Sequence, residues 1–131
     1  MLQNGKYLLD TNIVIAMFAN EVNIEEERQY TGKVFLPSPV IGELYYGARN
    51  SDRPIENIAR INRLTERIPN ISCNLETARW YGIIKNQLRR KGHLIPDNDI
   101  WIAAIALQRE LILVTRDAHF NEVESLHLEK W

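Results

Sequence analysis

Cysteine is almost missing from this chain of 131 residues, in which Cys73 stands alone. A single cysteine excludes an intrachain disulfide, disfavours a cysteine zinc site and favours a reducing, intracellular setting. The N-terminus has neither the basic lead nor the apolar segment of a secretion signal, and no apolar run reaches the roughly eighteen residues that span a bilayer. We therefore expect a cytoplasmic protein with no membrane partner.

The sequence also lacks an excess of charge of either sign, since 16 lysine and arginine residues stand against 17 aspartate and glutamate residues. This balance argues against a protein that simply coats a polyanion. It does not exclude nucleic acid, because an enzyme can gather carboxylates at its centre and basic residues around the rim. With 45% hydrophobic residues, no repeat and no low-complexity segment, residues 1–131 are predicted to form one globular domain.

Short apolar runs alternate with helical patterns along the whole chain. The predicted strands are Tyr7–Leu9, Val34–Leu36, Ile71–Cys73, Leu111–Val114 and Leu126–Leu128. The predicted helices are Ile13–Ala19 with Asn12 as N-cap, Val40–Arg49 with Ser38 as cap, a helix opening at Pro54, a helix from about Leu75 to near Gly92, and Ile100–Leu107, which is apolar on every side and must be buried. The polar connection 20–33 is expected to be a solvated loop or a short exposed helix. This alternation predicts a mainly parallel central sheet with helices on both faces, a three-layer α/β/α fold.

Four acidic residues sit where an apolar segment meets a turn or lies inside one. Asp10 follows the first strand and Asp117 follows the late strand, which places both at strand ends, where open α/β sheets bind ligands. Asp99 heads the apolar helix. Glu43 has Ile41, Leu44 and Tyr45 as neighbours, and we expect it on a substantially buried face.

Each acid also has a purely structural interpretation. Asp10 is able to share helix capping with Asn12, Asp99 to complement the helix dipole, and Asp117 to serve as a turn residue. Asp97 is better explained as the N-cap of its helix than as a metal ligand. The joint arrangement at strand ends favours a shared site for the other four.

Carboxylates that lie close together repel one another, and this repulsion has to be offset. Two of them about 4 Å apart repel by roughly 4 kcal/mol at an effective dielectric of 20, so a group of three or four takes up protons or recruits a cation. Mg²⁺ and Mn²⁺ prefer carboxylate and water oxygens and commonly hold a substrate phosphate. The acids therefore indicate a divalent metal site.

The order of these motifs resembles that of a PIN domain, and particularly of the VapC toxins of type II toxin–antitoxin pairs. The resemblance rests on Asp10-Thr-Asn12, Glu43 in a Gly-Glu-Leu setting, Asp99-Ile-Trp-Ile-Ala-Ala104, and Thr115-Arg-Asp117 with Phe120, and it extends over essentially the whole chain.

The resemblance implies a ribonuclease with Asp10, Glu43, Asp99 and Asp117 around one or two Mg²⁺ or Mn²⁺ ions and Thr115 as a polar helper. It also implies a homodimer, a cognate antitoxin whose tail occupies the acidic groove, and a structured RNA target such as tRNA or ribosomal RNA. An acid is frequent in relatives at the position of His119, so no further ligand is assigned there. We assign no catalytic role to the three scattered histidines, His93, His119 and His127.

The expected chemistry is phosphodiester hydrolysis without a side-chain nucleophile, because a metal ion makes hydroxide available near neutral pH. The chain has no convincing Ser-His-Asp or Cys-His signature and no Walker glycine loop. The candidates for holding the RNA backbone are Arg89, Arg90, Lys91, Arg116 and Arg49. For each of them a solvated or dipole-complementing helix end is the alternative.

Two other classes of protein share parts of this pattern. A phosphoacceptor receiver domain also has an acidic Mg²⁺ pocket at strand ends, but it uses a lysine after a late strand, where this chain has Thr115-Arg116. A non-catalytic PIN-like domain that binds RNA or protein is expected to lose one or more central acids, and none of the four is missing here.

Overall fold

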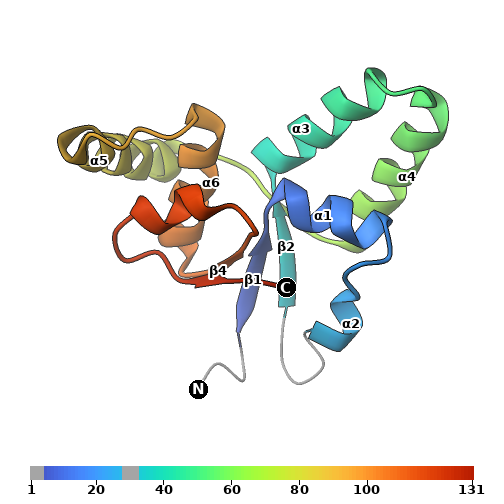
Figure 1. The fold of residues 1–131 in the computed structure, drawn as a ribbon, viewed down its shortest axis with the longest axis horizontal. Coiled ribbons are helices and arrows are strands. Elements are labelled where there is room, and N and C mark those ends of the chain that lie inside the picture. The colour runs from blue at the N-terminus through green and yellow to red at the C-terminus, as the bar shows by residue number, and fades with distance from the viewer. Residues whose placement is uncertain (1–4, 28–32) are drawn as a thin grey trace.

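A parallel sheet forms the centre of the computed structural model, which describes residues 5–27 and 33–131. Within these residues the strands are β1 (Lys6–Leu9), β2 (Lys33–Pro37), β3 (Asn70–Ile71), β4 (Ile112–Val114) and β5 (Leu128–Glu129), in the order β3-β2-β1-β4-β5 with every neighbouring pair parallel. The helices are α1 (Thr11–Phe18), α2 (Ile24–Glu27), α3 (Ser38–Arg49), α4 (Pro54–Arg67), α5 (Leu75–Lys91), α6 (Asp97–Arg109) and the short 3₁₀ helix η1 (Ala118–Glu122). The predicted three-layer α/β/α fold is confirmed (Figure 1).

The strand order contains one reversal, and it lies between β1 and β4. From β1 the chain adds β2 and β3 on one side of the sheet and then β4 and β5 on the other. A backbone hydrogen bond of 3.0 Å from the Asp10 amide to the Val114 carbonyl joins the two strands at their carboxyl ends. Open α/β sheets bind ligands in the crevice outside such a reversal. The residues that follow β1 and β4 are therefore the ones that the fold brings together.

The core surrounds these two strands. Tyr7, Leu8 and Leu9 of β1 and all three residues of β4 are buried. Helix α6 is buried from Ile102 to Ala106, as its apolar sequence predicted. None of the helices in the described part of the chain combines the length and the apolar character that crossing a membrane requires.

The starts of three helices differ from the sequence prediction. Asp10 is the N-cap of α1, not Asn12, because the helix follows the strand without a spacer. Pro37 and Pro96 occupy the N-cap positions of α3 and α6, so the predicted caps Ser38 and Asp97 are the first helical residues and neither helix has a side-chain cap. The capping prediction was wrong at these positions because a proline before the first turn sets the extended entry of the chain by its own restricted φ.

Other boundaries move by a few residues. The third strand is Asn70–Ile71 and leaves Cys73 exposed, and the last strand is Leu128–Glu129. Gly92 ends α5 in the left-handed conformation, with φ of 74°, as predicted. In the connection 20–33 the structure has the short α2, and residues 28–32 lie outside the described part of the chain.

Two helix pairs rise on either side of the strand ends. Helix α5 packs against α6, and α3 packs against α4. In Figure 1 the first pair lies at the left and the second at the right, with the upper ends of β1 and β2 between them. The space above the strand ends therefore lies between the two helix pairs.

Candidate metal centre

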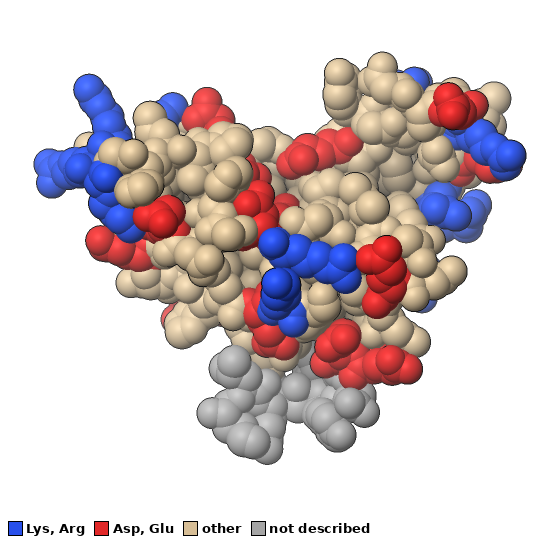
Figure 2. All heavy atoms as spheres, in the orientation of Figure 1, with Lys and Arg blue, Asp and Glu red and all other residues tan. Residues whose placement is uncertain are grey.

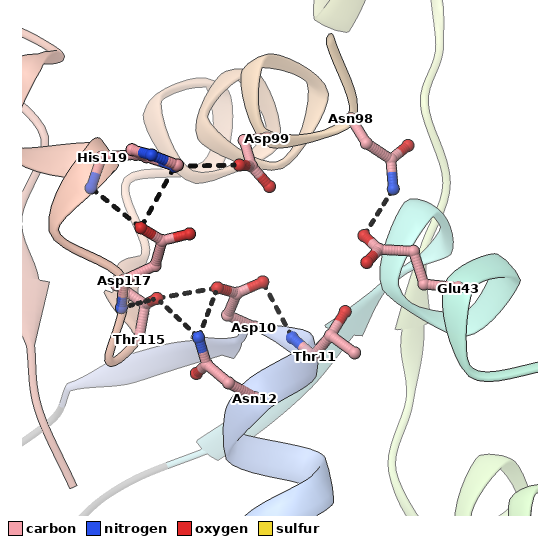
Figure 3. A network of polar contacts seen from close by, with 9 residues as sticks. All are labelled: Asp10, Thr11, Asn12, Glu43, Asn98, Asp99, Thr115, Asp117 and His119. Atoms are coloured by element: carbon pink, nitrogen blue, oxygen red, sulfur yellow. Dashed lines mark hydrogen bonds and ion pairs between the residues drawn. The ribbon is translucent and has the colours of Figure 1, made fainter. Parts of the chain in front are cut away.

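Asp10 is a buried carboxylate, with only 5% of its surface exposed. Its Oδ1 accepts a hydrogen bond of 2.8 Å from the Thr11 amide, which makes it the cap of α1. Its Oδ2 accepts from the Thr115 hydroxyl at 2.7 Å and from the Asn12 amide group at 3.2 Å (Figure 3). The capping interpretation of Asp10 is confirmed at Oδ1, whereas Oδ2 takes part in the hydrogen bonds that join the two strand ends.

Thr115 joins the two strand ends. Its hydroxyl, buried at 6% exposure, donates to Asp10 Oδ2 and accepts from the Asp117 amide at 3.0 Å. Asn12 spans the same gap, because its amide group donates to Asp10 and its Oδ1 accepts from the Arg116 amide at 3.1 Å. The residues after β1 and β4 thereby belong to one hydrogen-bonded network, and the role of Thr115 as a polar helper stays a prediction.

Asp99, Asp117 and His119 bring three potential ligand atoms together. One carboxylate oxygen of each acid and one ring nitrogen of the histidine lie within 4.8 Å of one another, the only such group of three or more found in residues 5–27 and 33–131. His119 Nδ1 lies 3.2 Å from Asp117 Oδ1 and 3.9 Å from Asp99 Oδ2. The sequence pattern did not assign His119 to the site, because the three histidines are scattered without paired spacing and relatives frequently have an acid at this position.

Glu43 reaches the site from the opposite side. It is exposed, so the prediction of a substantially buried face was wrong. The core face of α3 is formed by Val40, Leu44 and Ala48, which recur every fourth residue, and Glu43 lies one position off that stripe. Its Oε1 accepts a short hydrogen bond from the amide group of Asn98, in the first turn of α6. In Figure 3 the carboxylate of Glu43 points toward the other acids.

The four acids interact electrostatically with one another. The pKa of Asp99 is raised to about 6, first by burial and then by the negative charges of Asp10, Asp117 and Glu43, while His119 lowers it. Burial also raises the pKa of Asp10, against the hydrogen bonds from Thr115 and Thr11. Mutual repulsion of this kind is relieved by a cation, and carboxylates are the ligands that Mg²⁺ and Mn²⁺ prefer.

A buried hydroxyl without a partner lies beside the acids. Thr11 Oγ1 has no hydrogen-bond partner among the described residues, and in Figure 3 its side chain lies between Asp10 and Glu43. A buried polar atom normally has a partner, and the water that accompanies a hydrated ion is a natural one. The donor set, the repulsion and this hydroxyl together fit a divalent ion.

The surface around the acids is hollowed. In Figure 2 spheres of aspartate and glutamate lie on the walls of the hollow at the top of the molecule, between the two helix pairs. A pocket of about 360 Å³ adjoins it, with Thr11 and Glu43 in its lining together with apolar residues that include Ile15, Phe18 and Ile61. The site is therefore open to a large ligand.

The predicted basic residues belong to three separate segments of the chain. Arg89, Arg90 and Lys91 form the last turn of α5, and Lys91 pairs with Glu122 at 3.5 Å. Arg49 ends α3. Arg116 is beside the site in sequence, but its guanidinium is held by Glu21 at 3.0 Å and by the Trp131 carbonyl at 3.2 Å. Lysine and arginine spheres lie at the far left of Figure 2, where α5 is found in Figure 1.

Known proteins resemble this chain in sequence and in fold. The family model described as PIN domain matches residues 7–126. Ribonuclease VapC2 of Haemophilus influenzae is 39% identical over 130 residues, which cover 96% of this chain and 98% of that protein. The tRNA(fMet)-specific endonuclease VapC of Shigella flexneri is 35% identical, with 96% and 98% covered. The crystal structure of VapBC2 from Rickettsia felis, bound to a DNA fragment from its promoter, contains a chain that matches with a TM-score of 0.87 at 26% identity, covering 96% of this chain and 98% of that one.

Proposed function

This chain belongs to the PIN domain family, and from that premise we propose that it is a divalent-metal-dependent endoribonuclease that cleaves structured RNA and acts as the toxin of a toxin–antitoxin pair. We further propose that residues 1–131 act as one nuclease domain in the cytoplasm. One arrangement carries the proposal: ligand atoms of Asp99 and Asp117 lie within 4.8 Å of each other, and the negative charges of Asp10, Asp117 and Glu43 raise the pKa of Asp99, so we infer that the four acids share one site. That site lies at the reversal of the sheet.

Asp99 and Asp117 would hold Mg²⁺ or Mn²⁺, with Asp10 and Glu43 completing the set directly or through water. When bound, the ion lowers the pKa of a coordinated water and offsets negative charge on the scissile phosphate. Thr115 fixes Asp10 relative to Asp117, and Asn98 aims Glu43 into the site. No side chain has to act as a nucleophile.

Basic residues outside the hollow would hold the RNA backbone. Arg89, Arg90 and Lys91 are the first candidates, because they are exposed together at the end of one helix. Arg49 and Arg116 come second, and Glu21 partly neutralises Arg116 as Glu122 does Lys91. Phosphate contacts of this kind supply affinity without sequence preference.

The relatives support a more specific substrate. Because a similar protein is named a tRNA(fMet)-specific endonuclease, tRNA is the first substrate to test and ribosomal RNA the second. We propose an antitoxin partner because chains of similar fold and sequence are found in VapBC complexes. Its tail would occupy the acidic hollow, where a basic side chain finds complementary charge, and the adjoining apolar pocket with the 56%-exposed Ile15 would take apolar side chains.

A homodimer completes the proposal. Large apolar side chains are exposed on two helices, among them Ile55 of α4 at 87% and Leu75 of α5 at 68%. We propose these side chains as candidates for the dimer interface, which is expected to bury a contiguous apolar patch. Light scattering of the purified chain gives the oligomeric state directly.

The decisive experiment measures RNA cleavage with and without metal, in the parent protein and in a variant in which one carboxylate oxygen of Asp10 is replaced by an amide nitrogen. The purified chain is freed of metal with a chelator and then given Mg²⁺ or Mn²⁺ with transcribed tRNA. We expect cleavage only with metal, its loss in Asp10→Asn, and full activity in the matched control Asp52→Asn, whose carboxylate is exposed in the turn between α3 and α4. Cleavage by Asp10→Asn at the parent rate would reject the nuclease assignment.

The biological role needs a separate test. Brief induction in bacteria is expected to arrest growth, and sequencing of 5′ ends in the cellular RNA is expected to show new ends at one or a few sites. Co-expression of the neighbouring small antitoxin gene should relieve the arrest. If cells grow normally while they contain active enzyme, the protein is a nuclease but not a toxin.

A further inference from the structure

The ring of His119 is directed at two carboxylates that come from different elements. Asp117 is the N-cap of η1 and Asp99 lies in the first turn of α6. His119 Nδ1 is 3.2 Å from an oxygen of the first and 3.9 Å from an oxygen of the second. Figure 3 shows the ring above Asp117 and level with Asp99.

The main chain places this ring. The His119 amide donates to Asp117 Oδ1 at 3.0 Å, so the two residues are tied together in one turn. The next residue, Phe120, is fully buried and anchors η1 to the core. The position of His119 beside Asp117 is therefore set by the fold, although 56% of its side chain is exposed.

The distances from His119 Nδ1 to the two carboxylates suit an octahedral ion. With bonds of about 2.1 Å, adjacent ligand atoms lie about 3.0 Å apart and opposite ones about 4.2 Å apart. The two distances from His119 Nδ1 fall within this range. A lone pair that faces two carboxylates is favourable only when a proton or a metal ion lies between them, since all three atoms are acceptors.

We propose that His119 supplies a nitrogen ligand to the divalent ion held by Asp99 and Asp117, and that this ligand makes the centre prefer Mn²⁺ to Mg²⁺. The inference rests on the proposed metal-dependent nuclease and deepens it by naming the ion. Mg²⁺ takes oxygen ligands and gives up its waters reluctantly, whereas imidazole suits the transition metals. An imidazole in the ligand set therefore lowers the relative affinity for Mg²⁺.

The first test detects the nitrogen directly and needs no activity. Pulsed electron paramagnetic resonance of the purified chain with one equivalent of Mn²⁺ is expected to show modulation from a directly bound ¹⁴N nucleus. The signal should disappear in His119→Gln and remain in His93→Gln and His127→Gln, whose side chains are exposed and form no part of the group of ligand atoms. Bound Mn²⁺ without nitrogen coupling in the parent protein overturns the inference, and so does coupling that persists in His119→Gln.

The second test measures selectivity. Competition between Mn²⁺ and Mg²⁺, followed by calorimetry, gives the ratio of the two dissociation constants. We expect His119→Gln to reduce the preference for Mn²⁺ by about tenfold. His119→Asp, which restores a ligand but with oxygen, should recover affinity for both ions and keep the reduced preference. An unchanged ratio in both variants contradicts the role of the nitrogen.

The outcomes distinguish a failure of the His119 inference from a failure of the proposed nuclease function. Metal-dependent RNA cleavage with Mn²⁺ bound only through oxygen leaves the nuclease intact and removes His119 from the ligand set. A parent protein that binds neither ion and cuts no RNA removes both. In either case the folded state of each variant is checked by its thermal melting curve.

Discussion

The two walls of the acidic hollow hold their carboxylates in different ways. On the side of the sheet reversal, Asp10 accepts three hydrogen bonds, Thr115 joins it to the Asp117 amide, and the strand residues beneath, Tyr7–Leu9 and Ile112–Val114, are buried. On the side of α3, Glu43 is exposed and has one side-chain partner, Asn98, supplied by another helix. The first wall is fixed by several hydrogen bonds above buried strands, whereas on the second wall one side-chain hydrogen bond, from Asn98, holds Glu43. We therefore expect changes on the first wall to abolish function and changes on the second to reduce it.

The largest effect is expected for Asp99→Asn. This change removes a proposed ligand, and RNA cleavage should fall by more than about 100-fold, beyond the loss typical of outer-shell partners. Gel-based cleavage of tRNA at saturating Mn²⁺ measures it. The loss counts as removal of a ligand only if the melting curve shows that the variant is folded.

The same variant should be more stable than the parent when metal is absent. Asp99 has a folded pKa of about 6, above its ordinary value of 3.8, so the folded state binds the proton more tightly than the unfolded state does. Stability is then lost as pH rises from about 4 to about 6, and asparagine removes that loss. The rise in pKa corresponds to about 3 kcal/mol at most, which solvent screening reduces to about 1 to 2 kcal/mol. Melting in chelator should show a gain of several degrees at pH 7.5 and almost none at pH 4; a gain that does not depend on pH would contradict the electrostatic cause.

Thr115→Val tests the two hydrogen bonds through which Thr115 joins Asp10 to the Asp117 amide on the first wall. Valine keeps the shape but leaves Asp10 and the Asp117 amide without their common partner, so cleavage should fall by up to about 100-fold and stability by about 1 to 3 kcal/mol. Thr65→Val on α4, whose hydroxyl bonds only to a carbonyl in its own helix, is the matched control. Kinetics and urea unfolding give the two numbers. Parent-like kinetics in Thr115→Val would break the contrast between the walls.

A smaller effect is expected for Asn98→Ala on the second wall. Glu43 loses its partner but stays solvated, so cleavage should fall by about tenfold with stability changed by less than about 0.5 kcal/mol. Asn86→Ala, at an exposed position of α5, serves as control. If this variant loses more activity than Thr115→Val, Glu43 is not the loosely held acid that its exposure indicates.

The smallest effect belongs to residues outside both walls. Replacing Arg89, Arg90 and Lys91 together by alanine should raise KM for RNA several-fold, leave kcat unchanged and weaken the salt dependence of binding. Arg79→Ala on the same helix, where the guanidinium pairs with Glu76 at 3.2 Å, is the control. A fall in kcat would place these residues in the site itself.

The first wall was predictable from the sequence and the second was not. Asp10 and Asp117 follow apolar strands directly, and parallel strands bring their carboxyl ends to one edge, so their meeting follows from local pattern and topology. The contacts of Asn98 with Glu43 and of His119 with Asp99 join residues 55 and 20 positions apart, and they depend on how α6 lies against α3 and η1. No local periodicity carries that information. The neighbours of Glu43 in sequence indicate burial, whereas the buried stripe of every fourth residue in α3 leaves Glu43 exposed.

The central claim is that distant acids form one metal centre, and crystals soaked in Mn²⁺ test it most directly. Anomalous diffraction should show a peak about 2.0 to 2.4 Å from carboxylate oxygens of Asp99 and Asp117 and on the same side as Asp10 and Glu43. A protein that cuts RNA in the same buffer but shows no Mn²⁺ peak in the hollow, or one on another surface, would contradict the account.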